Sequence, residues 1–271
     1  MSGARARTTR ALRIARALAA STFAEATAYR AEIVIWMLAG SLPLIMMFVW
    51  MELAAAGPMG GYTPRAFAAY FLLVFLVRQM TPAWVMGSLD REIRLGEMSP
   101  LLLRPIDPYW QHAAWHLVGM VMKLPFVVPM VVAGLALADA LTLPHWERLP
   151  LFLLATLGGW AIQFNLMYAL GLIAFWTDQA TALESLAFTL LQVLGGVLIP
   201  LDLYPEAMRA LLPYTPYYYV VSFPVKVLTG DWSAAALAGT FAVQAVWIAG
   251  IVAVQRLLWR RGLRRYGAVG A

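Results

Sequence analysis

Long apolar runs, separated by short charged segments, are the feature that most constrains this chain. A bilayer core of about 30 Å requires about 20 apolar residues per helix. Lipid offers the backbone no hydrogen-bond partners, so only helices or closed barrels cross it, and the runs here are continuous rather than alternating. We therefore predict an all-α integral membrane protein, a single domain over residues 1–271. Its six transmembrane helices are expected near residues 33–54, 64–89, 109–139, 150–177, 184–201 and 232–258.

The composition supports a membrane environment and narrows the chemistry. Hydrophobic residues make up 62% of the chain and charged residues 13%, against about 25% charged residues in soluble domains. The net charge of +6 comes from arginines at the two termini and in one loop, where anionic lipid head groups would meet them. We therefore expect membrane lipids, and no nucleic acid, as partners. The absence of cysteine excludes disulfides, thiolate catalysis and cysteine metal sites.

The distribution of basic residues predicts the orientation. If the six spans alternate, 14 of the 20 Lys and Arg fall on one side and 4 on the other. Cytoplasmic loops carry the excess of Lys and Arg, so both termini are predicted to be cytoplasmic. Residues 1–30 are predicted to form an amphipathic interfacial helix, with Arg13 and Arg16 opposite Leu12 and Leu18. Residues 259–271 are predicted to form a basic cytoplasmic tail.

Two connections are longer than turns. The cytoplasmic connection, after the second span, starts with a short charged segment that is predicted to be helical. Gly96 is expected to end this helix, and Pro100 follows. The outer one, between spans five and six, contains a proline-started helix, Pro205–Leu212, followed by three tyrosines at 217–219. Tyrosines at such a place are typical of a membrane interface.

The chain carries no recognisable catalytic motif. It contains no phosphate-binding G-x-x-x-x-G-K-[ST], no H-E-x-x-H and no G-x-S-x-G sequence. If ATP drives this protein, another polypeptide must bind it. His112 and His116 lie four residues apart on a predicted helix, but two ligands without a third make a weak metal site, and packing beside Trp110 and Trp115 explains them better. We therefore predict neither a catalytic residue nor a bound metal.

A few polar residues lie inside the predicted spans. Arg78 is about 13 residues from either end of its span, where a guanidinium needs a water-filled cavity or a carboxylate partner. It is either a translocation-path residue or half of a structural ion pair. The amides Gln163, Asn165 and Gln192 either line a polar path or join helices to one another.

The order of these parts resembles the type-2 ABC transporter permeases, in particular a bacterial branch of that family. The resemblance is closest in Gly87-Ser-Leu-Asp-Arg-Glu-Ile-Arg-Leu-Gly-Glu-Met-Ser-Pro-Leu-Leu-Leu-Arg-Pro-Ile and in Gly195-Gly-Val-Leu-Ile-Pro-Leu-Asp-Leu-Tyr-Pro-Glu. The layout covers the whole chain, and these two motifs cover about an eighth of it. The resemblance implies the permease subunit of an ATP-driven exporter in the bacterial cytoplasmic membrane, with no enzymatic activity of its own.

The resemblance also implies partners and roles. Two permeases, identical or homologous, would pair with two cytoplasmic ABC ATPase subunits, which would hold the ATP and Mg²⁺, while this chain binds no cofactor. The ATPase-coupling helix would comprise Leu89, Asp90, Arg91, Glu92, Ile93, Arg94, Leu95 and Gly96. The outer gate helix would include Pro205, Glu206, Met208 and Arg209.

Two alternatives remain open at this point. The first is a secondary transporter or channel that works without an ATPase, against which stands the scarcity of intramembrane carboxylates for proton or sodium coupling. The second is a membrane enzyme that uses His112 and His116. The transported substrate is not encoded in any of these patterns.

Overall fold

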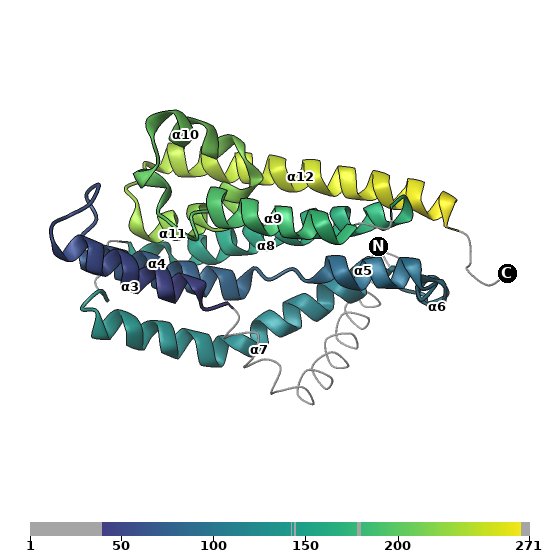
Figure 1. Cartoon of the computed structure of the whole chain (residues 1–271), viewed down its shortest axis with the longest axis horizontal. Coiled ribbons are helices and arrows are strands. Elements are labelled where there is room, and N and C mark those ends of the chain that lie inside the picture. Colours follow the sequence, from purple (N-terminus) through teal and green to yellow (C-terminus); the bar gives the residue numbers. More distant parts are fainter. Residues whose placement is uncertain (1–39, 142, 144, 178–179, 267–271) are drawn as a thin grey trace, which may run out of the picture.

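The computed structural model describes residues 40–141, 143, 145–177 and 180–266, and every regular element in them is a helix (Figure 1). The helices are α3 (Leu42–Ala55), α4 (Pro64–Met80), α5 (Val85–Arg94), α6 (Met98–Leu102), α7 (Pro108–Leu137), α8 (Leu149–Gly171), α9 (Ala180–Leu194), α10 (Glu206–Leu211), α11 (Ser222–Thr229) and α12 (Ala234–Arg265). Short 3-10 turns lie at Trp146–Arg148, Leu172–Phe175, Leu201–Leu203, Leu212–Tyr214 and Pro216–Tyr219.

Four helical segments are long and apolar enough to cross a membrane, and they coincide with four of the six predicted spans. They are Pro64–Arg94, Pro108–Leu137, Trp146–Phe175 and Ala234–Arg265. The predicted first and fifth spans correspond to shorter apolar helices, Leu42–Ala55 and Leu183–Leu194. The start of the predicted first span and the predicted N-terminal amphipathic helix lie outside the described residues.

The second span is interrupted, where the sequence predicted a continuous helix. Residues 81–84 separate α4 from α5, and the two helices follow one another in line (Figure 1). Pro82 has no N–H to donate to the helix ladder and disfavours helical geometry at Thr81. The Thr81 hydroxyl donates to the Val77 carbonyl at 2.9 Å and so satisfies one backbone group at the break.

Helix α4 forms the centre of the bundle. In the most apolar window of the Pro64–Arg94 segment 72% of residues are buried, against 22% for Pro108–Leu137 and 17% for Ala234–Arg265. Phe67, Phe71 and Phe75, one turn apart along α4, are almost completely buried against α3 and α7. The apolar outer faces of α7 and α12 are therefore left for lipid or for a partner.

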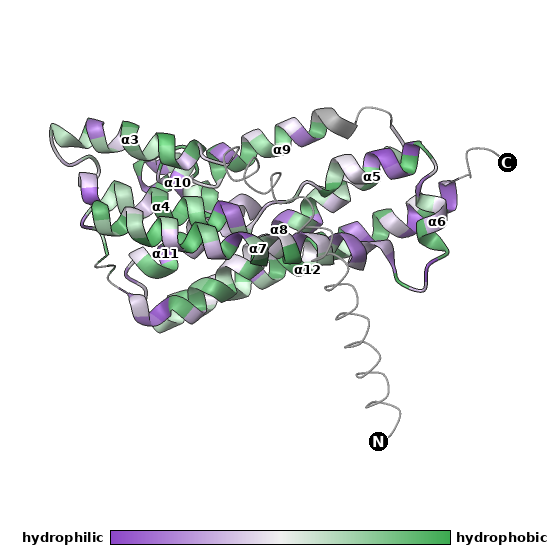
Figure 2. Cartoon of the chain, turned by 90° about the horizontal axis from the view of Figure 1, so that it is seen from below, coloured by the Kyte–Doolittle hydropathy of each residue, from purple (hydrophilic) through white to green (hydrophobic). Residues whose placement is uncertain are grey.

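The two ends of the bundle carry different elements (Figures 1 and 2). We call one the α6 end, because α5, α6, the start of α7 and the end of α12 meet there. The Ser99 Oγ and Tyr266 Oη atoms, 3.1 Å apart, join α6 to the end of α12. The α10 end carries α10, the turn at residues 57–63 and the start of α12. Hydrophilic residues concentrate on the second half of α5, whereas α4, α7 and α8 are mostly hydrophobic (Figure 2).

The connection over residues 202–231, predicted as an outer surface loop, is only partly a surface segment. Its second half folds back into the bundle as α11, whose Phe223, Val225 and Val227 are completely buried. Helix α11 packs against α8 and α4. Pro224 and Lys226 interrupt the apolar pattern of α11, so the sequence does not indicate a core helix, and only tertiary contacts show which face is covered.

Candidate functional site

The most exposed apolar side chains of the α6 end gather around α6. Leu103 is 88% exposed and Leu95 65% exposed, and Leu102 is also exposed. Three arginines surround them, Arg91, Arg94 and Arg104, all with exposed side chains. We call these six residues the α6 tip. Exposed leucines bordered by arginines are typical of a surface that another protein covers.

Of the predicted coupling helix, residues 89–94 form the second half of α5, which begins at Val85 and ends at Arg94. Gly96 follows with a φ of +76°, so its predicted role as the helix-ending residue is confirmed. Only Arg91, Arg94 and Leu95 of the predicted set belong to the exposed tip. Leu102, Leu103 and Arg104 were missed by sequence reasoning. A detectable signal was present, because three consecutive leucines between prolines cannot all lie on the buried face of one helix.

The apolar side chains of α5 face the bundle. Leu89 and Ile93 are buried, four residues apart on one helix face. The Glu92 carboxylate lies 3.2 Å from Nε2 of His112 on α7, and both side chains are mostly buried. Asp90 pairs with Arg94 along the helix at 3.6 Å. Helix α5 is thus fixed to α7 through a polar contact and to α8 through apolar ones.

His112 and His116 do not share a ligand site. His112 is directed to Glu92, while His116 is buried against the rings of Trp115 and Phe164. Within the described residues, no group of three histidine, cysteine, aspartate or glutamate side chains could hold a metal ion. The arrangement agrees with the packing interpretation of His116.

At the α10 end, polar side chains bind the backbone where α9 ends. Tyr70 of α4 donates to the Gly196 carbonyl at 2.7 Å, and Ser222 of α11 donates to the Gly195 carbonyl at 2.9 Å. Trp50 of α3 donates to the Leu198 carbonyl at 2.9 Å. We call Trp50, Tyr70, Ser222 and residues 195–198 the carbonyl hub. Non-helical backbone among apolar helices is stable only when its polar groups are satisfied in this way.

Glycine is required at the centre of the hub. Gly196 has a φ of +80°, a conformation that side chains with a Cβ rarely adopt. A Cβ atom at this position would lie 2.6 Å from the Tyr70 hydroxyl and would also collide with Ser222. The close approach of two hydroxyl groups to the backbone therefore depends on Gly196.

Next to the hub, Asp202 joins three elements. Its carboxylate accepts hydrogen bonds from the Tyr62 hydroxyl at 2.8 Å and from the Lys226 ammonium at 2.6 Å. Burial by itself would raise the pKa of the Asp202 carboxyl, but Lys226 and Tyr62 together hold that pKa below its usual value. The contact ties the turn at residues 57–63 to α11.

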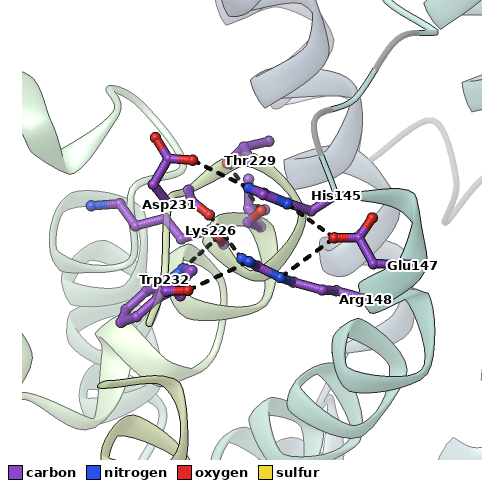
Figure 3. Close-up of polar contacts among 9 residues, drawn as sticks. His145, Glu147, Arg148, Lys226, Thr229, Asp231 and Trp232 are labelled. Atoms are coloured by element: carbon purple, nitrogen blue, oxygen red, sulfur yellow. Dashed lines mark hydrogen bonds and ion pairs between the residues drawn. The ribbon is translucent and has the colours of Figure 1, made fainter. Parts of the chain in front are cut away.

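A second polar group at the same end is drawn in Figure 3. Both ring nitrogens of His145 face carboxylates, Nδ1 that of Glu147 at 3.1 Å and Nε2 that of Asp231 at 3.2 Å. Arg148 donates to the backbone carbonyls of Gly230 and Trp232 (Figure 3). This group ties the start of α8 to the turn between α11 and α12.

The predicted translocation-path residues occupy different environments. Arg78 lies in the last turn of α4, where a cation interacts favourably with the helix dipole, and within the described part of the chain it has no hydrogen-bond or ion-pair partner. Gln163 is completely buried, and both polar atoms of its amide lack partners there too. Gln192 has one such atom. Asn165 instead joins helices, since it accepts from Tyr109 of α7 at 3.1 Å.

A comparison with known families decides what kind of protein carries these features. A family model described as an ABC-2 family transporter protein matches residues 35–270. The chain belongs to the ABC-2 transporter family. A search among curated proteins finds no match. As an ABC-2 transporter with membrane-spanning helices, it is a multi-pass membrane transport protein, and the resemblance that the sequence motifs suggested is confirmed.

The segment predicted as the outer gate helix, Pro205–Leu212, is helical over a shorter range. Helix α10 spans Glu206–Leu211, with Pro205 directly before it, and all of its residues are exposed, Met208 and Arg209 included. The 3-10 turn that follows buries Leu212. The helix is therefore held to the bundle by its flanks rather than by its own side chains.

Proposed function

We propose that this chain is the permease subunit of an ATP-driven exporter with six transmembrane helices, and that it works as a dimer with an identical or homologous permease. Separate ABC ATPase subunits, which hold the ATP and Mg²⁺, dock on the α6 tip. The observation that carries the proposal is the combination of ABC-2 membership with this exposed tip. The chain contains no phosphate-binding loop, so hydrolysis requires the partner.

The distribution of basic residues supports a cytoplasmic α6 end. Its described part carries eight arginines, three in the tip and five between residues 256 and 265. The α10 end carries four basic residues, Arg65, Arg148, Arg209 and Lys226. By the positive-inside rule both termini are cytoplasmic, which in a bacterium places the protein in the inner membrane. Helix α10 then lies at the outer surface as part of the exit gate.

The α6 tip has the composition of an interaction surface. Leu103 and Leu95 offer apolar area for a pocket on the partner, and the three arginines can pair with acidic groups around its edge. Exposure of these leucines to water is unfavourable, and the tip lies beyond the mostly hydrophobic helices (Figure 2). A docked ATPase subunit would bury them.

Movement of a docked ATPase would reach the membrane through α5. The Glu92–His112 contact and the buried Leu89 couple α5 to α7 and α8, and the break at residues 81–84 lets α5 tilt without unfolding α4. We place the translocation path along α4, α8 and α9, at Arg78, Gln163 and Gln192. Within the described residues, both polar atoms of the Gln163 amide and the amide oxygen of Gln192 lack hydrogen-bond partners. Asn165 contributes by joining α7 to α8.

The test removes the leucines of the tip without disturbing the fold. The double variant Leu95→Ser, Leu103→Ser is purified from the membranes of its host, and the co-purifying ATPase is quantified through its G-x-x-x-x-G-K-[ST] peptide. We expect at least about a tenfold loss of ATPase, since buried apolar anchors dominate such interfaces. Glu92 is left unchanged, because its substitution would also break the contact with His112.

The matched control is the double variant Leu137→Ser, Leu211→Ser, which alters two equally exposed leucines at the α10 end. It should retain the ATPase. Unchanged ATPase recovery in the tip variant would remove the docking role from this surface. A wild-type chain that recruits no ATPase would favour the secondary transporter or channel instead.

A further inference from the structure

A cavity of about 520 Å³ opens at the α10 end, beside the Asp202 contact. It lies between the turn at residues 57–63, the start of α4, the segment after α7 and the end of α11. Its volume is in the range of about 300–1,000 Å³ that is usual for small-molecule sites. Ala66, Ala69 and Leu143 give it apolar walls.

Two charges of opposite sign line this cavity. Arg65 forms an ion pair at 3.0 Å with Asp139, whose side chain is 91% exposed. Such an exposed pair contributes little free energy, so another anion can replace Asp139 at low cost. Asp202 is held in place by Tyr62 and Lys226, yet a carboxylate offers about four lone-pair directions and can accept from a further donor.

The balance of charge selects the ligand. The charges of Arg65, Asp139, Asp202 and Lys226 sum to zero, so a ligand with a single charge would give the site a net charge, whereas a zwitterion would keep it neutral. A ligand that carries both an anionic group and an ammonium group can pair with Arg65 and Asp202 together. Charge complementarity of this kind discriminates by rejecting the wrong sign as well as by attracting the right one.

We infer that this cavity binds a zwitterion that combines a phosphate with a primary ammonium group, the chemistry of an aminophospholipid head group. The phosphate contacts Arg65, the ammonium contacts Asp202, and the alanine wall carries the adjoining apolar part. The same chemistry exists in a free solute, phosphoethanolamine, and the experiment separates the two sources. The inference does not depend on an ATPase partner, so it stands apart from the proposed function.

The test measures binding to the purified full chain in a non-ionic detergent by isothermal titration calorimetry. The probes are dihexanoyl-phosphatidylethanolamine, dihexanoyl-phosphatidylglycerol and phosphoethanolamine. We expect the ethanolamine lipid to bind at least about tenfold more tightly than the anionic glycerol lipid. Arg65→Gln should weaken its binding by about tenfold, because one charge-assisted contact is lost. Arg261→Gln, exposed on α12 at the α6 end, is the matched control and should bind as wild type does.

A second variant tests the cavity itself. Ala66→Phe fills part of the volume and should abolish binding, and a melting curve of each variant shows that it is folded. Equal binding of the glycerol lipid, or wild-type binding by both Arg65→Gln and Ala66→Phe, would overturn the inference. Free phosphoethanolamine binding as tightly as the lipid identifies a site for the head group alone, and much weaker binding identifies a lipid site.

Discussion

At the α10 end, side chains from α3, α4 and α11 donate hydrogen bonds to the backbone of residues 195–198, whereas at the α6 end charged and apolar side chains of the tip project away from the bundle. The carbonyl hub places its polar groups inside the protein, with each donor fixed by a specific acceptor. The α6 tip leaves leucines exposed to water and keeps its ion pairs, such as Arg91 with Glu97, near the surface.

This difference separates stability from interaction. Loss of a donor in the hub leaves a buried carbonyl without a partner. This change destabilises the folded state relative to the unfolded state, in which water hydrogen-bonds the carbonyl. Loss of a charge or a leucine in the tip leaves nothing buried, so the fold is indifferent to it. Substitutions in the hub should therefore lower stability, and substitutions in the tip should alter only the contact with a partner.

The largest effect is expected for Gly196→Ala. The left-handed backbone and the collision with Tyr70 and Ser222 act together, and we expect a destabilisation of about 3 kcal/mol or more. The measurement is the apparent Tm of the purified protein in detergent. Gly250→Ala is the control, because a Cβ atom there meets nothing within 4 Å. An unchanged Tm for Gly196→Ala would show that the hub tolerates another backbone geometry.

An intermediate effect is expected for Tyr70→Phe. This change removes only the hydroxyl and leaves the Gly196 carbonyl without its donor, at a cost of about 1–3 kcal/mol. Tyr214→Phe serves as the control, since Tyr214 is 78% exposed. Both are followed by the Tm in detergent. If the two variants had the same Tm, the hydrogen bond to Gly196 would contribute nothing to stability, and the contrast between the two ends would weaken.

The sequence was sufficient for the features that depend on local pattern. Apolar runs between charges located four long spans, and Gly96 marked the end of α5, because helix length and helix termination are set by neighbouring residues. The extension of the third span to a single helix over Pro108–Leu137 follows from the same continuity, although Pro125 and Pro129 lie inside it.

Features that depend on distant contacts were not predictable. Tyr70 and Gly196 are 126 positions apart, and nothing near either residue indicates the other. The burial of α11 and the exposure of Leu103 were unpredictable for the same reason. The sequence pattern around an apolar residue is the same whether or not another helix covers it. A polar ring group such as that of Trp50 within a span was the available hint, because buried Trp and Tyr usually find a hydrogen-bond partner.

The smallest effect is expected for Asp202→Asn, and pH separates it from the others. Lys226 and Tyr62 hold the pKa of Asp202 below its ordinary value of about 3.9. A group whose pKa is lower in the folded state stabilises the fold above its unfolded pKa, and this contribution disappears as the pH falls through the folded pKa. Because Asp202 is partly exposed, we expect about 1 kcal/mol near pH 7. The Tm difference between wild type and variant should therefore shrink below about pH 4.

The matched control at the other end is Glu97→Gln, which removes the carboxylate of the Arg91 pair in the α6 tip. That pair spans 3.5 Å with both side chains more than half exposed, so its contribution should lie near zero at every pH. Melting curves of wild type, Asp202→Asn and Glu97→Gln between pH 3 and pH 7 give the comparison directly. Equal Tm losses for the two variants would contradict the difference between the ends, because a carboxylate joining three elements would then count no more than one on an exposed helix tip.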